Sequence, residues 1–417
     1  MKLLYWLIMN LATPFVAPFF LFKARGRARL LERFGIWGKL SDNKIFWFHA
    51  ASVGEVNGIL SLIRSCRKRF PDHDFLLTST SVTGLKVAEA EVTHLRLLPF
   101  DGIIWIALAT KNLDIERFFF GETELWPSLL TFFNRRRIPT HMINGVISDT
   151  TFNRYLTFRK LFCASLETLS TLSMSNQTSA DRILALGATE DRIVVTGNTK
   201  YDRAPSIQSQ EQIERLRKSL ALKSAPTLVL ASIHPPEFEP WLSGALSLLD
   251  GGIDFQVIIA PRHKEKLGFF LQKLRSSNIA FKTRSSQLEG GDSDNGYCPV
   301  LLLDTLGELE QIFSLTDLAF IGGTLCAVGG HNPLEAASYS NALCFGPETF
   351  KISELVADLK LKNACSVLNS SEEIRKLVQS WLQDPLKYKQ QGQRAREVWL
   401  SHQGAADRVM HQIFAGD

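Results

Sequence analysis

Residues 45–80 have the sequence IFWFHAASVGEVNGILSLIRSCRKRFPDHDFLLTST, and the fold class follows from this stretch. Ile45–Ala50 and Phe75–Thr80 are short apolar runs with the length of a strand, and Glu55–Cys66 between them is amphipathic. The apolar residues of this middle segment recur at helical spacing: Val56, Ile59, Leu60 and Ile63. A strand, a helix and a second strand in this order are typical of a βαβ unit, in which the two strands run parallel.

The alternation of strand and helix continues through two consecutive blocks of the chain. The first block has further predicted strands at Leu95–Pro99, Arg117–Gly121, His141–Asn144, Leu172–Ser175 and Ile193–Gly197, and a predicted helix at Glu124–Arg136. The second block has predicted strands at Thr227–Ser232, Phe255–Ala260, Val300–Asp304, Leu318–Gly322 and Ala342–Phe345. This pattern indicates the α/β class, with two Rossmann-like domains that each have a mainly parallel sheet between layers of helices. Because such sheets bind ligands outside the carboxyl ends of their strands, we expect the domains to face a central cleft.

The domain boundaries follow from the composition along the chain. The polar stretch Tyr201–Gln210 is the best candidate for a linker, Arg284–Gly296 is predicted to be a flexible surface loop, and Leu386–Phe414 is predicted to be helical. We therefore expect three parts: residues 1–34 as a membrane anchor with a basic segment, residues 35–203 as the N-terminal domain, and residues 204–417 as the C-terminal domain with closing helices.

The composition argues against several classes of protein. With 417 residues the chain is too long for one ordinary core, and a net charge of +5 is too small an excess to indicate nucleic-acid binding. The six cysteines lie far apart, without a CxxC motif or a nearby histidine at metal-ligand spacing, so neither a metal site nor a disulfide framework is expected. This cysteine usage suits a reducing compartment such as the cytoplasm.

The N-terminal segment Leu3–Phe22 is apolar and uncharged, and about 20 such residues are enough to span a bilayer. A cluster of basic residues follows it: Lys23, Arg25, Arg27, Arg29 and Arg33. Basic residues at this position place the rest of the chain on the cytoplasmic face and attract anionic lipids. The alternative is a buried N-terminal helix of a soluble domain, and a membrane anchor could either span the bilayer or lie in its interface.

Charged motifs lie where predicted strands of the first domain end. Ser52 and Glu55 match the S-x-x-E pattern, so Glu55 is either a general base or the partner of Ser52 in a capping box. The start of a helix would lower the pKa of Glu55 by favouring its ionised form. Either one of Glu122 and Glu124 enters the cleft, or both occupy the first turn of a helix. Lys200 either meets an anionic substrate or is a solvated linker residue.

The predicted strands of the second domain end in motifs that favour an anionic nucleotide. They are Ser232-Ile-His234, Pro261-Arg-His263, Asp304-Thr-Leu-Gly-Glu308, Gly322-Gly-Thr324 and, at the next helix start, Gly329-Gly-His-Asn-Pro-Leu-Glu335. Arg262 and His263 supply positive charge or hydrogen-bond donors, and paired glycines allow backbone N–H groups to approach a phosphate. Asn332 is expected to be the N-cap of that helix. No G-x-G-x-x-G or P-loop motif is present, which argues against a dehydrogenase and a P-loop enzyme.

In this order and spacing, seven motifs resemble those of the 3-deoxy-D-manno-octulosonic acid (Kdo) transferase family: SVGE, ETELWP, TGNTKYD, PRH, DTLGEL, FIGGTL and GGHNPLEAA. The resemblance covers nearly the whole chain, including the apolar N-terminal segment. It implies a GT-B fold and an inverting transfer of Kdo from CMP-Kdo to the lipid A precursor (lipid IVA), with release of CMP and without a metal ion or other cofactor. It also implies contact with inner-membrane lipids at the cytoplasmic face of the inner membrane, in lipopolysaccharide core biosynthesis.

The resemblance further implies roles for individual residues. Glu55 matches the catalytic base, and one carboxylate is enough for inverting, in-line attack. The residues expected on the acceptor side are Ser52, Gly54, Glu122 and Glu124. The residues expected to bind the donor are Lys200, Arg262, His263, Gly307, Glu308, Gly322, Gly323, Thr324, Asn332 and Glu335.

Two features depart from the family pattern. Val146 stands where many relatives have a basic residue, and Pro235 and Pro236 interrupt an acidic stretch after His234. These departures bear on the contacts with the acceptor and on the number of sugars added. Two other functions are kept as alternatives. One is a GT-B enzyme that uses a UDP-sugar, and the other is a membrane-tethered protein that binds a sugar nucleotide without catalysis.

Overall fold

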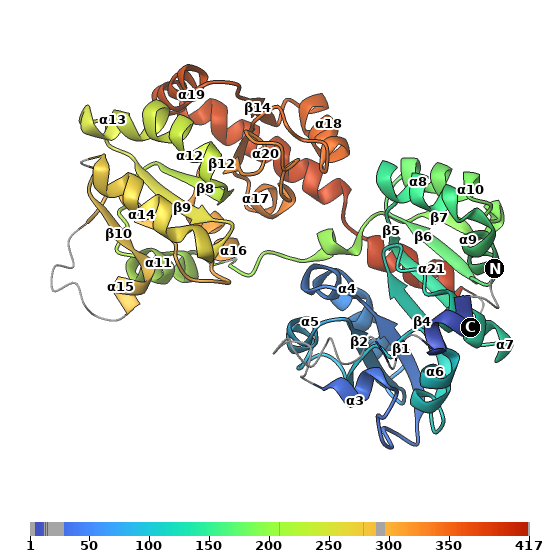
Figure 1. Ribbon diagram of the computed structural model, residues 1–417. Helices are drawn as coiled ribbons and strands as arrows, with labels where there is room; N and C mark the ends of the chain where they lie inside the picture. Colours follow the sequence, from blue (N-terminus) through green and yellow to red (C-terminus); the bar gives the residue numbers. More distant parts are fainter. Residues whose placement is uncertain are drawn as a thin grey trace. The chain divides into compact units, whose positions relative to one another are not determined.

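The protein forms two compact units, shown in Figure 1 as a computed structural model that describes residues 5–11, 13, 15, 29–207, 209–277, 279–288 and 297–415. The first unit comprises Met1–Arg203 and His402–Asp417, and the second comprises Ala204–Ser401. Each unit is built around its own seven-stranded parallel sheet. The predicted α/β class with two Rossmann-like domains is therefore confirmed.

The first sheet has the strand order β3-β2-β1-β4-β5-β6-β7. Its strands are β1 (Lys44–His49), β2 (Asp74–Ser79), β3 (His94–Leu97), β4 (Asp114–Gly121), β5 (Thr140–Gly145), β6 (Thr171–Met174) and β7 (Ile193–Val195). All seven coincide with strands predicted from the sequence. The order runs outward in both directions from β1 and β4, which pair with each other, so the topological switch point lies between these two strands.

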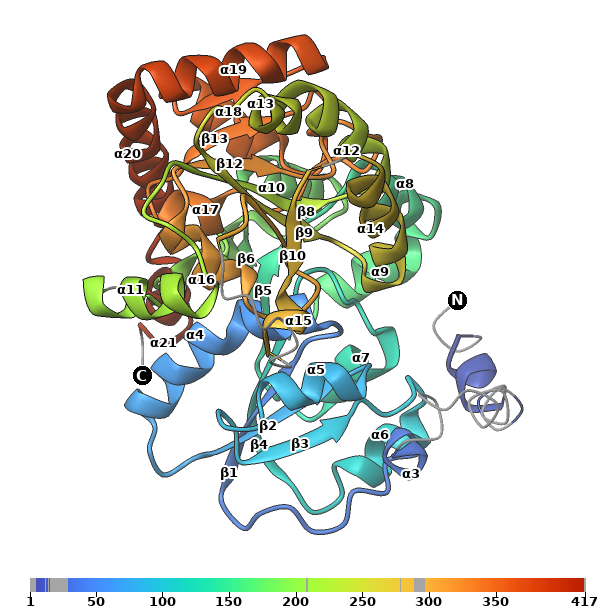
Figure 2. The same cartoon turned by 90° about the vertical axis from the view of Figure 1, so that its left-hand side faces the viewer.

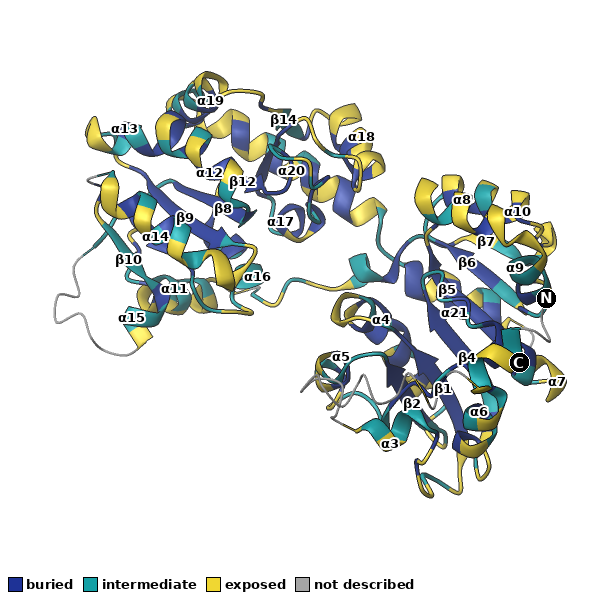
Figure 3. Cartoon of the chain, in the orientation of Figure 1, coloured by how far each residue is buried: buried dark blue, intermediate teal, exposed yellow. Residues whose placement is uncertain are grey.

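Successive side chains of β1 point to opposite faces of the first sheet. Phe46 and Phe48 pack in one core cluster, and Ile45 and Trp47 pack in the other. The helices on the first face are α4 (Val53–Arg69), α5 (Val82–Val87) and α21 (Ala405–Phe414). The helices on the second face are α6 (Ile103–Ala109), α7 (Pro127–Arg135), α8 (Asp149–Thr157), α9 (Arg159–Leu166) and α10 (Gln177–Ala185). Figure 3 shows the resulting pattern, with buried strands between helices that expose one side.

The C-terminal residues differ from the predicted arrangement. The segment Leu386–Phe414, which was predicted to be helical, forms two helices, α20 (Pro385–Ser401) and α21. The second of them, α21, belongs to the first unit. Its apolar side chains join the core that contains α4 and β1: Val409, Met410, Ile413 and Phe414. The Asp202 carboxylate accepts the backbone N–H groups of Ala405 and Ala406, which satisfies the start of this helix. The last residues of the chain thus complete the core of the first unit, so residues 402–417 do not belong to the second domain.

The second sheet has the strand order β10-β11-β9-β8-β12-β13-β14. Its strands are β8 (Thr227–Ile233), β9 (Gln256–Pro261), β10 (Phe281–Thr283), β11 (Val300–Leu302), β12 (Leu318–Ile321), β13 (Ala342–Phe345) and β14 (Cys365–Val367). The sequence predicted five of them and missed β10 and β14, the two edge strands. The switch point lies between β8 and β12, which pair with each other.

The helices of the second unit flank this sheet and are shown in Figures 1 and 2. They are α11 (Gln210–Ser219), α12 (Pro235–Trp241), α13 (Ser247–Asp250), α14 (Leu267–Ser276), α15 (Arg284–Leu288), α16 (Leu309–Ile312), α17 (Leu334–Ser338), α18 (Ser353–Leu361), α19 (Ser371–Gln383) and α20. Residues 284–288 of the predicted loop form the helix α15 instead, and its first residue, Arg284, is buried and pairs with Glu308. Residues 289–296 of that predicted loop lie outside the described residues.

The predicted N-terminal anchor is described at residues 5–11, 13 and 15, all of them helical. This helical segment is held against the first unit by side chains. The Tyr5 hydroxyl donates to Asp101 at 2.7 Å, and the Ile104 N–H donates to Asn10 Oδ1 at 3.2 Å. The rest of the apolar segment and Lys23, Arg25 and Arg27 lie outside the described residues. Among the helices that the structure describes, none has both the length and the apolar composition needed to cross a bilayer.

Candidate active site

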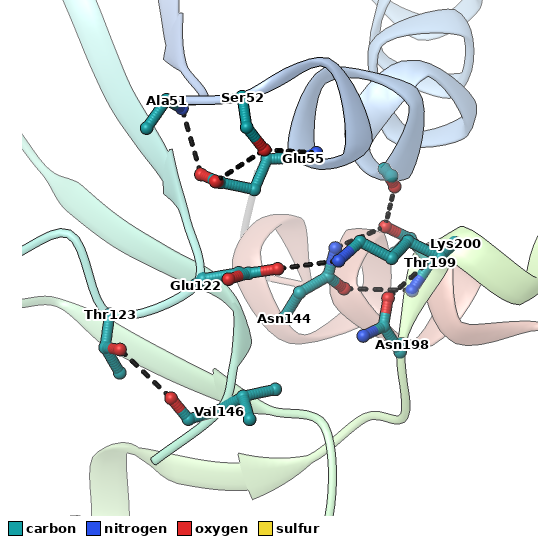
Figure 4. Close-up of polar contacts among 11 residues, drawn as sticks. Ala51, Ser52, Glu55, Glu122, Thr123, Asn144, Val146, Asn198, Thr199 and Lys200 are labelled. Atoms are coloured by element: carbon teal, nitrogen blue, oxygen red, sulfur yellow. Dashed lines mark hydrogen bonds and ion pairs between the residues drawn. The ribbon is translucent and has the colours of Figure 1, made fainter. Parts of the chain in front are cut away.

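Glu55 lies at the carboxyl edge of the first sheet, at the switch point between β1 and β4. The helix α4 begins at Val53, directly after the N-cap Ser52. The Ser52 hydroxyl accepts the Glu55 backbone N–H at 3.2 Å and donates to Glu55 Oε1 at 2.8 Å. The Ala51 N–H donates to Glu55 Oε2 at 2.9 Å (Figure 4). The half of the predicted capping box that the Ser52 side chain forms is therefore present, whereas the Glu55 carboxylate accepts the N–H of Ala51 and not that of the N-cap Ser52.

This capping arrangement fixes the carboxylate without using up its capacity to accept a proton. Each oxygen of Glu55 accepts one hydrogen bond, and a carboxylate oxygen has lone pairs for two. A Cβ atom on Gly54 would have only Ser52 Oγ, at 3.9 Å, as a neighbour within 4 Å, so the helix surface beside Glu55 is open. The geometry is thus compatible with both interpretations of Glu55, as a cap and as a base.

Partial burial raises the pKa of Glu55 above its ordinary value, and the charge of Glu122 raises it further. Hydrogen bonds from Ala51 and Ser52 and the charge of Lys200 act in the opposite direction. The expected lowering of this pKa at a helix start is therefore wrong in its net direction, because burial outweighs the groups that favour the ionised form. A base is most effective when its pKa lies near the working pH, so a raised pKa suits proton abstraction.

Glu122 and Lys200 form an ion pair near Glu55, with 2.6 Å between Glu122 Oε1 and Lys200 Nζ (Figure 4). Gly58 of α4 leaves room for the lysine, because a Cβ atom there would come within 2.7 Å of Lys200 Cγ. The sequence grouped Lys200 with the donor residues of the second domain. It lies in the first unit, as its place at the end of the predicted first domain indicates, and the structure joins it in one cluster with Glu55 and Glu122.

Asn144 holds the turn that carries Lys200. Its side-chain amide donates to Thr199 Oγ1 at 2.8 Å, and the Thr199 N–H donates to Asn144 Oδ1 at 2.9 Å. Both groups are buried, so the two hydrogen bonds fix the turn η2 (Thr199–Asp202) to the end of β5. This residue lies in the segment around Val146 that departs from the family pattern, and the sequence did not assign it a role.

The two acidic residues of ETELWP have different surroundings. Glu122 has a left-handed backbone with φ 55°, and it forms a turn that delays the start of α7 to Pro127, three residues after the predicted start at Glu124. Glu124 lines a pocket of about 190 Å³, whose other residues are Thr123, Leu125, Trp126, Arg154, Tyr155 and Phe162. Glu122 therefore forms an ion pair with Lys200, whereas Glu124 lines the pocket.

The pocket beside Glu124 combines a carboxylate, a guanidinium group and aromatic rings. Burial raises the pKa of Glu124, and the charges of Glu55 and Glu122 raise it further. The Tyr155 hydroxyl donates to the Thr123 carbonyl at 2.7 Å, which fixes one wall of the pocket. The sequence gave no signal for Arg154 or Tyr155, because they lie on α8 and meet Glu124 only through the tertiary fold.

In the second unit, Glu237 organises the loops at the switch point between β8 and β12. Its side chain is fully buried and accepts the backbone N–H groups of His234 at 2.9 Å, Gly323 at 2.8 Å, and Thr324 and Leu325 at 2.9 Å each. Pro235 and Pro236 occupy the first two positions of α12, where a helix does not need their missing N–H groups. The prolines therefore leave Glu237 at the third position, and the departure from the family pattern does not remove this carboxylate.

The glycine-rich motifs use their backbone N–H groups within the protein. The Gly322 N–H donates to Ala231 at 2.8 Å, and those of Gly329 and Gly330 donate to the Gly323 carbonyl at 2.9 and 2.8 Å. Together with the bonds to Glu237, these contacts occupy the amides that the sequence suggested for a phosphate. Glycine is required at Gly322 for packing, because a Cβ atom there would lie 2.3 Å from the Ser232 carbonyl oxygen.

Cationic and imidazole side chains surround these loops. Arg262 and His263 are exposed directly after β9, and the His263 ring lies 5.4 Å from that of His234. His234 Nε2 lies 2.9 Å from His331 Nε2. The structure thus brings the predicted Arg262 and His263 together with His234, from the motif Ser232-Ile-His234, and with His331, from the glycine-rich motif. Neither histidine is among the donor residues predicted from the sequence, although both follow strands that flank the switch point.

The other predicted donor residues differ from one another in burial and in their hydrogen-bond partners. Asn332 Oδ1 accepts the Leu334 N–H at 3.0 Å, so Asn332 satisfies the start of α17, which begins at Leu334 and not at Pro333. Glu335 is exposed. Glu308 is engaged by the buried Arg284, with 3.0 Å between Glu308 Oε1 and Arg284 Nε, which indicates a structural role. Gly307 adopts φ 87°, a left-handed conformation that favours glycine.

Within the described ranges, no group of three or more His, Cys, Asp or Glu side chains is arranged to hold a metal ion.

Comparison with known proteins adds evidence from outside the chain. Residues 28–203 match the family model described as 3-Deoxy-D-manno-octulosonic-acid transferase (kdotransferase). The chain is 30% identical over 355 residues to the 3-deoxy-D-manno-octulosonic acid transferase of Chlamydia muridarum, covering 83% of this chain and 80% of that protein.

Two further comparisons agree with these similarities. The transferase of the same description from Rickettsia felis is 30% identical over 333 residues, covering 79% of this chain and 70% of that protein. Among solved structures, a UDP-GlcNAc 2-epimerase from Neisseria meningitidis superposes with a TM-score of 0.62, covering 89% of this chain and 100% of that chain at 12% identity. At 12% identity, the similarity to the epimerase is evidence only for the fold.

Proposed function

Because this chain belongs to the 3-deoxy-D-manno-octulosonic acid (Kdo) transferase family, and is therefore a glycosyltransferase that transfers Kdo in lipopolysaccharide core biosynthesis, we propose the substrates and residues of its reaction. The donor is CMP-Kdo, the acceptor is the lipid A precursor, and the anomeric carbon is inverted as CMP is released. The observation that carries the proposal is the position of Glu55, a partly buried carboxylate held at the switch point by Ser52 and Ala51.

In the proposed mechanism Glu55 is the general base. It takes the proton of the acceptor hydroxyl as the hydroxyl oxygen attacks the anomeric carbon of Kdo. The bond between that carbon and the phosphate oxygen of the donor breaks, and its electron pair leaves with CMP. Because attack and departure occur in line, one carboxylate is enough and a nucleophilic second carboxylate is not needed. The mechanism uses no metal ion and no other cofactor.

The donor is proposed to bind to the second unit at the switch point between β8 and β12. Arg262 and His263 offer charge and hydrogen bonds to its phosphate, and the exposed Glu335 offers a carboxylate to the ribose hydroxyls. The remaining predicted positions stay in the proposal as the frame of this site: Gly307, Glu308, Gly322, Gly323, Thr324 and Asn332. Lys200, by contrast, is proposed to act on Glu122 and Glu55 within the first unit.

The acceptor is proposed to bind to the first unit next to Glu55. Ser52, Gly54 and Glu122 form the surface around the base, and the pocket beside Glu124 is large enough for a sugar group. Its aromatic rings and charged side chains suit a polar sugar with an anionic substituent.

A lipid acceptor requires contact with a membrane, and we propose that the N-terminal segment provides it at the cytoplasmic face of the inner membrane. Several of its apolar side chains are exposed: Leu7, Ile8, Leu11 and Phe15. The basic residues after the segment are proposed to contact anionic lipid head groups. Since Tyr5 and Asn10 hold the segment to the first unit, an arrangement within the membrane interface is favoured over a spanning helix.

Nucleotide binding tests this proposal against its alternatives. CMP should bind to the full-length protein more tightly than UDP in calorimetric titrations, because the proposed donor carries cytidine monophosphate. Tighter binding of UDP would favour a UDP-sugar enzyme. Tight binding of CMP without any transfer of Kdo to the lipid A precursor would favour a binding protein without catalysis.

A further inference from the structure

We propose that His234 and His331 form a proton-sharing pair that binds the donor's phosphate and takes up a proton when the phosphate arrives. This inference rests on the proposed function in one respect, namely that the nucleotide binds to the second unit. It adds two phosphate-binding residues to the donor residues predicted from the sequence, and it assigns them a chemical role.

The geometry of the two rings defines the pair. His234 Nε2 and His331 Nε2 are 2.9 Å apart, and the rings are parallel within 3°. A neutral imidazole has one N–H and one acceptor nitrogen, so a hydrogen bond between two Nε2 atoms requires one ring to donate and the other to accept. The two Nε2 atoms therefore share one proton, and the two neutral rings are in opposite tautomers. A second proton at this contact would place two N–H groups head to head, so further protonation must break the bond or occur at an Nδ1 atom.

The surroundings of the pair are mainly cationic. Arg262 and His263 face it from the end of β9, Lys351 faces it from the segment after β13, and Glu237 faces His234 from α12. The carboxylate of Glu237 is already held by four backbone N–H groups. An excess of positive groups around a partly exposed pair of histidines is the arrangement expected for an anion site.

These surroundings keep the free pair neutral. Burial, together with the charges of Arg262, His234, Lys351 and His263, lowers the pKa of His331 to about 4. Burial also lowers the pKa of His234, with Glu237 acting in the opposite direction. A phosphate placed beside the rings adds negative charge there and so favours the protonated form. Proton uptake on binding follows, at any pH between the pKa of the free pair and that of the occupied pair.

The proton has a use in the proposed reaction. When the bond between Kdo and the phosphate breaks, the phosphate gains the electron pair and a second negative charge. A protonated histidine pair lies where that charge develops and stabilises it more than it stabilises the singly charged donor. The acceptor's own proton goes to Glu55, so the histidine pair need not release its proton for the step to balance.

Calorimetric titration of CMP into the full-length protein near pH 6.5, in buffers with different ionisation enthalpies, counts the protons taken up. We expect the protein to take up more protons with CMP than either His331→Gln or His234→Gln does, by roughly half a proton or more. The phosphate of CMP itself titrates at about pH 6, but this contribution is common to all variants and cancels in the comparison. Cytidine, which lacks the phosphate, should bind without this uptake. His411→Gln, which changes an exposed histidine of the first unit, should behave like the unaltered protein.

Equal proton uptake in the unaltered protein and in both folded variants would overturn the inference. If CMP does not bind at all, the proposed donor site fails instead, so the two failures are distinguishable. A second measurement needs no variant and covers the case in which the substitutions prevent folding. In ¹⁵N spectra of the imidazole rings, CMP should move the titration of one or both paired histidines to higher pH, and unchanged titrations with CMP bound would contradict the inference.

Discussion

Lys200 Nζ lies 2.6 Å from Glu122 Oε1, and the two members of this ion pair act on Glu55 in opposite directions. The charge of Glu122 raises the pKa of Glu55, and the charge of Lys200 lowers it. The ion pair therefore acts on the pKa of Glu55 through its charges, and substitution of each member separately should shift this pKa in opposite directions.

The first prediction concerns the pH dependence of transfer. A general base works when it is deprotonated, so kcat/KM should fall as the pH falls through the pKa of Glu55. Lys200→Met removes a charge that lowers this pKa, so the acidic limb should move to higher pH. Glu122→Gln removes a charge that raises it, so the limb should move to lower pH. Profiles of kcat/KM against pH check both signs, and a shift of both variants in the same direction would contradict this account of Glu55.

The second prediction separates the base from the cap. Glu55→Gln keeps an oxygen that can accept a hydrogen bond but removes the basic carboxylate, so transfer should fall by about 10²–10⁴-fold with little change in melting temperature. Ser52→Ala is the matched control, because it removes the capping hydroxyl and keeps the carboxylate. It should lose about 1 kcal/mol of stability and retain far more activity than Glu55→Gln. Full activity in Glu55→Gln would leave only the structural role.

The third prediction places the donor in the second unit. Arg262→Ala should weaken CMP binding by about 10–100-fold, because charge-assisted hydrogen bonds are worth roughly 1.5–3 kcal/mol each. Glu335→Ala should also weaken it, if the carboxylate holds the ribose. Lys273→Ala is the control, since Lys273 pairs with Glu239 on the surface of the same unit. The affinity of each variant for CMP is measured by calorimetry, and melting temperatures show whether the variants fold. Unchanged affinity for CMP in both test variants would contradict a donor site at this position.

The fourth prediction concerns the membrane. Deletion of residues 1–22 should release the protein from membranes but leave transfer to a detergent-solubilised acceptor, because Glu55 and its neighbours lie elsewhere in the first unit. Tyr5→Phe, which loses only the hydrogen bond to Asp101, should stay on membranes. Sedimentation with vesicles distinguishes the outcomes. A truncated protein that still sediments in high salt would count against the N-terminal contact, and release only in high salt would point to the basic residues instead.

Local patterns were enough to predict the described strands except β10 and β14, and to predict the position of Glu55 at the end of a strand. The apolar runs of the first block became all seven strands of the first sheet, because buried parallel strands have a strong local signature. The S-x-x-E pattern likewise predicted the contact between Ser52 and Glu55. The missed strands β10 and β14 have three residues each, which is too short for a periodic signal.

Long-range contacts account for the rest of what the sequence did not reveal. Glu237 accepts N–H groups from residues 86 to 88 positions away, and Cys66 contacts Met410 across 344 positions. A local sequence pattern does not predict hydrogen-bond partners or contacts that are so far apart in the chain. The direction of the pKa shift of Glu55 was missed for the same reason, since burial is a property of the fold and not of the motif.

The most direct test of the central claim is the reaction itself. The purified protein is incubated with CMP-Kdo and the tetra-acyl lipid A precursor, in parallel with Glu55→Gln, and the lipid products are analysed by mass spectrometry. The unaltered protein should convert the precursor to a product heavier by one or more Kdo units and release CMP, while Glu55→Gln should form little or none in the same time. No Kdo-containing lipid from the unaltered protein, or equal product from both proteins, would contradict the account.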